Sequence, residues 1–135
     1  MHPIIRWTDD LDLHHEPLDC AHRDFVAALA TAQAADDAGL PDAWAQVVAH
    51  ARAFFELEDG WMRNTRFAAA ANHTLQHRVV LNLLHEGLAQ ARQGHHDAVR
   101  DMANELAAWF SRHVQTHDAA LALHMRRHPV RARPG

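Results

Sequence analysis

The sequence predicts an all-α protein: an up-down-up-down antiparallel four-helix bundle with a non-periodic N-terminal arm. Four segments carry apolar residues at the three- and four-residue spacing of an amphipathic helix. No stretch of useful length alternates between apolar and polar residues as a strand would, and the short connections favour antiparallel neighbours. At 135 residues the chain has the length of one domain.

The first two helices are expected to begin at prolines, which suit a first helical turn. Pro17 opens the first helix, which should stop near Gly39. Pro41 opens the second helix, which should end at about Asn64 and Thr65.

The third and fourth helices complete the predicted bundle. The third carries its core stripe from His73 to Leu88 and should end before Gly94, and the fourth carries its stripe from Val99 to Leu121. We therefore expect the bundle to span residues 1–125, including an arm of residues 1–16, and a basic C-terminal tail to span residues 126–135.

Composition narrows the classes of function. A formal net charge of −4 argues against a nucleic-acid partner, which would require a basic face. No apolar run has the length of a signal peptide or a membrane span, so no membrane partner is expected. A lone cysteine, Cys20, allows no internal disulfide, and we expect a cytoplasmic protein.

The core stripes of all four helices contain polar residues where Leu or Val would be usual. They are His22, Glu58, His73, His77 and His113. A buried carboxylate without a partner costs several kcal/mol, so Glu58 needs a cation or a proton. Each histidine alone could be a hydrogen-bonded core residue, but the five polar residues together favour a metal site.

The spacing of these residues indicates the kind of metal. His73 and His77 lie one helical turn apart, so both imidazoles can reach one cation. Asp118 follows His113 by five residues and adds a carboxylate that can bridge two metals. Imidazole with carboxylate favours iron, zinc or manganese.

Four segments resemble the hemerythrin family, specifically the single-domain bacterial hemerythrins. Trp7 and "DCAHRDF" are similar to the family's opening tryptophan and its first-helix Asp-x-x-His, and "FELEDGWM" resembles the second-helix segment around Glu58. "HTLQH" resembles the third-helix histidine pair, and "WFSRHVQTHD" resembles the last-helix segment with His113 and Asp118.

The resemblance implies a non-haem iron protein that binds dioxygen or a related small ligand. Two irons are expected, bridged by Glu58 and Asp118, with His73, His77 and His113 on one iron and His22 on the other. Dioxygen would bind at the second iron. The expected ligand pocket, whose residues are equally compatible with ordinary core packing, consists of Phe54, Phe55, Trp109, Phe110 and Val114.

One position departs from the family pattern. Phe54 stands where the family has a histidine, so the second iron loses an imidazole and a site with only one iron becomes conceivable. On a regular helix His117 would face inward beside Asp118, and we hypothesise that it replaces the lost ligand. The alternatives are a core histidine at position 117, bonded to a carbonyl or to Asp118, and a water on the second metal; His50 lies too far along the axis.

Three functions remain open at this stage. The first is a hemerythrin-type dioxygen-binding protein that is not an enzyme. The second is a mono-iron or modified di-iron protein that acts as a scavenger or sensor of peroxide, NO or O2, which leaves a consuming activity open. The third is a metal-free or zinc-filled bundle that serves only as a binding partner.

Overall fold

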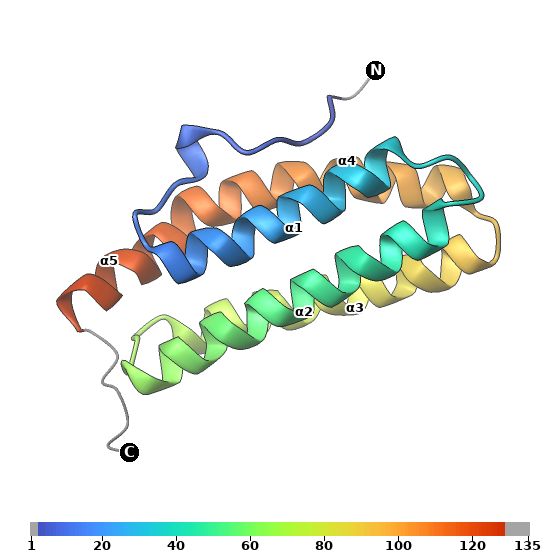
Figure 1. The fold of residues 1–135 in the computed structure, drawn as a ribbon. Helices are drawn as coiled ribbons and strands as arrows, with labels where there is room; N and C mark the ends of the chain where they lie inside the picture. Colours follow the sequence, from blue (N-terminus) through green and yellow to red (C-terminus); the bar gives the residue numbers. More distant parts are fainter. Residues whose placement is uncertain (1–2, 129–135) are drawn as a thin grey trace, which may run out of the picture.

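The computed structural model describes residues 3–128 and confirms the predicted all-α bundle. The long helices pack side by side, and the N-terminal arm lies along the outside (Figure 1). The helices are the short 3₁₀ turn Asp9–Leu11, α1 (Glu16–Ala34), α2 (Leu40–Asn64), α3 (Ala70–Arg92), α4 (His96–His113), the π-helical turn Val114–Asp118 and α5 (Ala119–Arg127).

The start of α1 is fixed by its own side chains. Nδ1 of His15 accepts a hydrogen bond from the Leu18 backbone N–H at 3.2 Å, and Pro17 occupies the first turn as predicted. The helix ends at Ala34, earlier than the predicted stop near Gly39. Gly39 instead precedes α2, where the Asp36 carboxylate accepts a hydrogen bond from its backbone N–H at 2.8 Å.

The ends of α2 and α3 agree with the sequence. The α2 helix ends at Asn64, and α3 ends at Arg92, before Gly94. Gly94 adopts φ +84°, a left-handed conformation that glycine reaches without steric cost. The chain can therefore turn sharply from α3 into α4.

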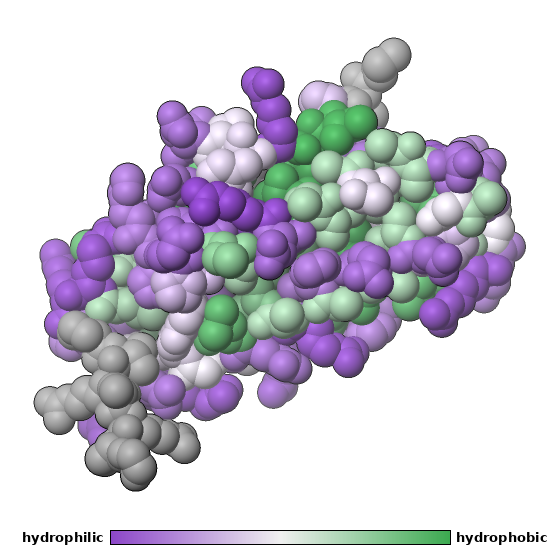
Figure 2. Space-filling view, viewed as in Figure 1, coloured by the Kyte–Doolittle hydropathy of each residue, from purple (hydrophilic) through white to green (hydrophobic). Residues whose placement is uncertain are grey.

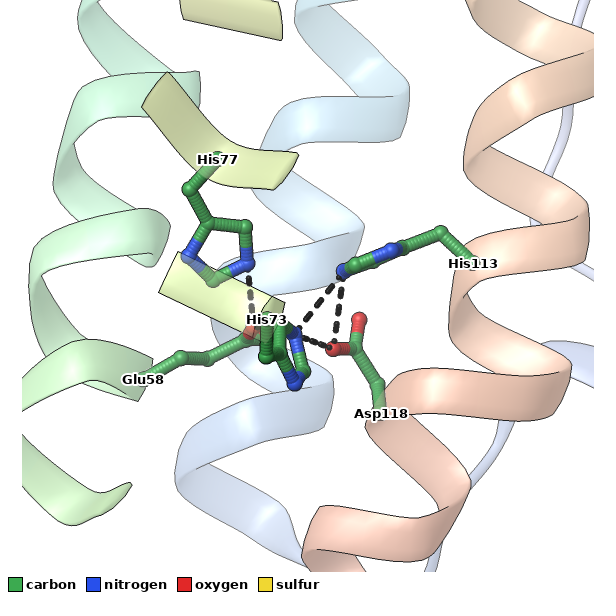
Figure 3. Close-up of side chains that lie close together, drawn as sticks. All are labelled: Glu58, His73, His77, His113 and Asp118. Atoms are coloured by element: carbon green, nitrogen blue, oxygen red, sulfur yellow. Dashed lines mark hydrogen bonds and ion pairs between the residues drawn. The ribbon is translucent and has the colours of Figure 1, made fainter. Parts of the chain in front are cut away.

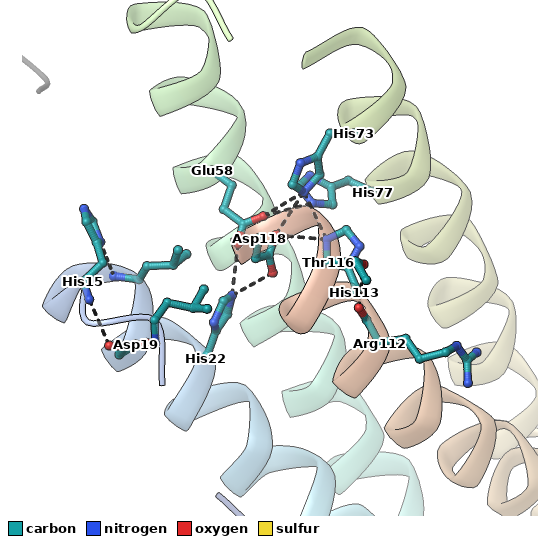
Figure 4. Close-up of polar contacts among 12 residues, drawn as sticks. His15, Asp19, His22, Glu58, His73, His77, Arg112, His113, Thr116 and Asp118 are labelled. Atoms are coloured by element: carbon teal, nitrogen blue, oxygen red, sulfur yellow. Dashed lines mark hydrogen bonds and ion pairs between the residues drawn. The ribbon is translucent and has the colours of Figure 1, made fainter. Parts of the chain in front are cut away.

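The fourth rod of the bundle consists of α4, the π-helical turn and α5, and is not the single regular helix that the sequence predicts. A π-helical turn, Val114–Asp118, lies between α4 and α5 and inserts one extra residue into the helical ladder. The Thr116 hydroxyl donates to the Arg112 carbonyl at 2.6 Å and satisfies one acceptor of this widened turn (Figure 4). The extra residue changes which side chains of this rod face the core.

The N-terminal arm is held to the bundle by specific contacts. Asp19 is buried and accepts hydrogen bonds from the backbone N–H groups of Leu13 at 2.9 Å and His15 at 3.1 Å. Arg23 lies over the Trp7 ring at 4.8 Å, a cation–π contact. Figure 2 shows hydrophilic residues over most of this face, with a small hydrophobic group beside the start of the described chain.

The predicted basic tail, residues 126–135, lies mostly outside the described residues. Arg126 and Arg127 form the end of α5, and Arg126 donates to the Leu13 carbonyl at 3.1 Å. Residues 129–135 are not described. Within residues 3–128, none of the helices combines the length and apolar character needed to cross a bilayer.

Candidate metal centre

The core of the bundle contains a cluster of polar side chains. All six residues predicted from the sequence as metal ligands are at most 2% exposed. They come from α1, α2, α3, α4 and the π-helical turn, so the bundle must form before they meet. They are His22, Glu58, His73, His77, His113 and Asp118.

Three imidazoles and two carboxylates form one half of this cluster (Figure 3). Glu58 Oε1 lies 3.3 Å from His73 Nε2 and 3.1 Å from His77 Nε2. Asp118 Oδ1 lies 3.0 Å from His73 Nε2 and 3.1 Å from His113 Nε2. One donor atom from each of these five residues lies within 4.8 Å of all the others, so the group could hold one metal ion.

His22 alone supplies the imidazole of the other half. Its Nε2 lies 3.0 Å from Glu58 Oε2 and 3.2 Å from Asp118 Oδ2 (Figure 4). Each carboxylate therefore turns one oxygen to the three-histidine half and its second oxygen to the His22 half. This is the arrangement that a pair of bridging carboxylates requires.

Four of the unsatisfied buried atoms of the cluster fit a metal. Glu58 Oε1, both Asp118 oxygens and His77 Nε2 are buried without a hydrogen-bond partner among the described residues. His73 Nε2 and His113 Nε2 face each other at 3.0 Å, where both can offer lone pairs only to a shared cation or proton. Since orphaned buried acceptors are costly, a cation stabilises this arrangement.

The pKa shifts in the cluster show that its carboxylates stabilise positive charge on the neighbouring imidazoles. Burial alone would lower the pKa of His22, but contacts with the negatively charged carboxylates of Asp118 and Glu58 raise it to about 9. Burial would lower the pKa of His73 as well, but the effect of the same two carboxylates outweighs that of burial and raises this pKa to about 9. Although burial would raise the pKa of Asp118, its close contacts with the imidazoles of His113, His22 and His73 hold it well below its usual range. The buried carboxylates stay ionised and attract protons or a metal.

Asp59 orients one of the imidazoles, a role that the sequence interpretation missed. Its Oδ1 accepts hydrogen bonds from His77 Nδ1 at 2.8 Å and from the Thr74 hydroxyl at 3.0 Å. Burial would lower the pKa of His77, but the Asp59 and Glu58 contacts raise it. The bond fixes the tautomer that leaves Nε2 free for a metal, as carboxylate–histidine pairs do in metalloproteins. The acidic residue directly after Glu58 was the available signal.

The aromatic residues predicted to line a pocket surround the cluster. Phe55 stacks on His77 with ring centroids 4.1 Å apart, and Trp109 stacks on His113 at 4.4 Å. Phe54 and Phe110 meet the His22 ring edge-on at 5.3 and 5.4 Å. Trp109 is only partly buried, whereas Phe54, Phe55, Phe110 and Val114 are buried.

The structure places the ring of His117 beside His113 and His73. Its ring stacks on His113 with centroids 5.3 Å apart and lies 5.6 Å from His73, beside the three-histidine half. His117 Nε2 lies 3.3 Å from Gln76 Nε2, and the side chain is only partly buried. The extra residue of the π-helical turn gives Asp118 the inward position that a regular helix would give to His117.

The fold and the cluster define a class of protein: a four-helix bundle with a buried histidine–carboxylate centre suited to metal ions. No protein-family model matches the chain. A bacteriohemerythrin from Ralstonia nicotianae is 30% identical over 116 residues, which cover 86% of this chain and 85% of that protein. The chain belongs to the hemerythrin family, and the family implies iron as the metal.

Proposed function

We propose that the chain is a non-haem di-iron protein that binds dioxygen or a related small ligand without being an enzyme. His73, His77 and His113 hold one iron, His22 holds the other, and Glu58 and Asp118 bridge them. The division of the carboxylate oxygens between the two halves of the cluster carries this proposal: each half receives one oxygen of Glu58 and one of Asp118.

The chain's own residues determine how such a centre behaves. Iron(II) supplies the electrons that binding of dioxygen requires. The stacked rings of Phe55 and Trp109 hold the imidazoles of His77 and His113 in place. Buried Phe54, Phe110 and Val114 keep water from the centre, which raises the strength of every electrostatic contact within it.

Iron loading after chelation tests the proposal. The chelator-treated protein is refilled with iron(II) without oxygen, its iron is counted, and its absorption is followed as oxygen is admitted and removed. We expect two irons per chain and a spectral change that reverses when oxygen is removed. A protein that takes up no iron(II) on refilling, or whose absorption does not change when oxygen is admitted, would contradict the proposal.

A matched pair of variants on α3 makes the test specific. His77→Gln removes a proposed ligand, whereas His85→Gln changes an exposed histidine of the same helix whose Nε2 lies 2.9 Å from Arg52 Nη2. We expect His77→Gln to lower the iron content and His85→Gln to leave it unchanged. Equal iron content in the two variants would remove His77 from the proposed ligand set.

A second candidate function keeps the iron but not reversible binding. Phe54 occupies the family's histidine position and is fully buried against His22. This observation favours a scavenger or sensor of peroxide, NO or O2 that has a weakened second iron or only one iron. Rapid oxidation in air that is not reversed by removing oxygen would favour this candidate over the carrier.

A further inference from the structure

The two halves of the metal centre differ in their donor atoms. The three-histidine half offers three imidazole nitrogens and two carboxylate oxygens. The His22 half offers one imidazole nitrogen and two carboxylate oxygens. One half is therefore rich in nitrogen donors, and the other has mainly oxygen donors.

Aromatic rings occupy the space where the His22 half could have gained another nitrogen. Phe54 lies edge-on to His22, and its ring is 5.2 Å from Phe25. The Phe110 ring also meets the His22 ring edge-on, and its centroid lies 4.8 Å from that of the Phe25 ring. These three phenylalanines are at most 1% exposed and pack against one another, so they fix the low donor count of this half.

Among the described residues, the rings that pack against His22 are those of Phe54 and Phe110, not that of His117. The His117 ring lies beside His73 and His113, on the nitrogen-rich half. Its partner Gln76 also comes from α3. The difference between the two halves is therefore built into the positions of α1, α2 and the π-helical turn.

We propose that the His22 half is a second metal position that fills after the three-histidine half, binds metal more weakly, and accepts manganese(II) as well as iron(II). This inference rests on the proposed metal-binding function. Imidazole suits iron and zinc, whereas carboxylate oxygens suit manganese, which generally binds a given site more weakly than either. The second metal must also share Glu58 and Asp118 with a cation already bound, which lowers its affinity further. The protein can therefore hold a mixed pair of metals.

Zinc followed by manganese(II) separates the two positions. One equivalent of zinc, which has no redox chemistry, is added to the chelator-treated full-length chain. Manganese(II) is then titrated in, and loss of the free-ion electron paramagnetic resonance signal reports binding. We expect one manganese per chain to bind without releasing the zinc.

Three variants test where that manganese binds. His22→Ala should abolish manganese uptake and leave binding of the first zinc intact. Phe54→His restores an imidazole and should tighten binding of a second zinc by at least about tenfold, the lower end of the range for altered metal shells. His85→Ala, an exposed change on α3, should behave as the unaltered protein does.

The results distinguish two kinds of failure. If two zinc ions bind with equal affinity and manganese is excluded, the unequal-site inference is wrong while the metal centre remains. If one zinc binds and no second metal follows, the inference is also wrong. If no zinc or iron binds at all, the proposed function itself is wrong. The measurement on the unaltered chain decides the inference even if a core variant fails to fold.

Discussion

Two glycines inside helices are expected to respond oppositely to the same change. Alanine is favoured over glycine in a helix interior by about 1 kcal/mol, so propensity alone predicts that Gly60→Ala and Gly87→Ala both stabilise the protein. Gly60 lies in α2, and a Cβ there would meet only Arg63 Nη2, at 3.9 Å. Gly87 lies in α3, where a Cβ would meet Met102 Sδ at 2.6 Å and Trp44 Nε1 at 2.9 Å.

The expected cost at Gly87 follows from these contacts. Trp44 is fully buried, and its Nε1 donates to the Leu84 carbonyl at 2.9 Å. Overpacking costs about 1–3 kcal/mol, and a displaced, unsatisfied indole N–H adds about 1–3 kcal/mol. After about 1 kcal/mol gained from propensity, we expect Gly87→Ala to lower the free energy of unfolding by about 1–5 kcal/mol.

Urea unfolding of the two variants at equal metal loading measures this difference. Gly60→Ala should raise the free energy of unfolding by up to about 1 kcal/mol, whereas Gly87→Ala should lower it. Trp fluorescence would report whether the indole of Trp44 has moved. Stabilisation by Gly87→Ala, or a loss of equal size in both variants, would refute the argument that Trp44 and Met102 approach this glycine too closely for a methyl group.

Two further predictions concern the metal centre. Asp59→Ala should weaken metal binding by about 10–100-fold in a chelator competition because His77 loses the carboxylate that orients it. Asp59→Asn keeps a hydrogen-bond acceptor and should weaken metal binding less. An unchanged metal affinity of Asp59→Ala would contradict the orienting role. In the metal-free protein the pKa of His22 and of His73 lies at about 9, above the ordinary 6.5, so their stabilising contribution is complete below pH 6.5 and is lost as pH rises to about 9. A shift of this size corresponds to about 3 kcal/mol, and the two histidines do not contribute it independently because both contact Glu58 and Asp118. Urea unfolding at a series of pH values should show the decline, and a flat profile between these pH values would contradict it.

Helix positions and the buried polar residues could be predicted from the sequence for a simple reason. A helix that packs on a core repeats its apolar residues every three or four positions, so a histidine or glutamate on that stripe stands out. His22, Glu58, His73, His77 and His113 were found in this way, and all are buried. The end of α1 was placed too late because the residues before Gly39 gave no strong stop signal.

The geometry between residues could not be predicted in the same way. At about 100° per residue, a regular helix sets Asp118 well to one side of His113 and brings His117 nearer to the core. In the π-helical turn Asp118, and not His117, is the residue that faces the core, and no single residue type in Val114–Asp118 predicts such a turn. The division of the Glu58 oxygens, and the bond from Asp59 to His77, depend on side-chain rotamers that spacing does not determine.

The π-helical turn also bears on how the chain tolerates changes in length. A widened turn holds one residue more than an α-helical turn, while the side chains before and after it keep the same side of the rod. Deleting exposed Gln115 would therefore relax Val114–Asp118 into an ordinary turn and leave the carboxylate of Asp118 beside His113. We therefore expect deletion of Gln115 to weaken metal binding less than Asp118→Ala does.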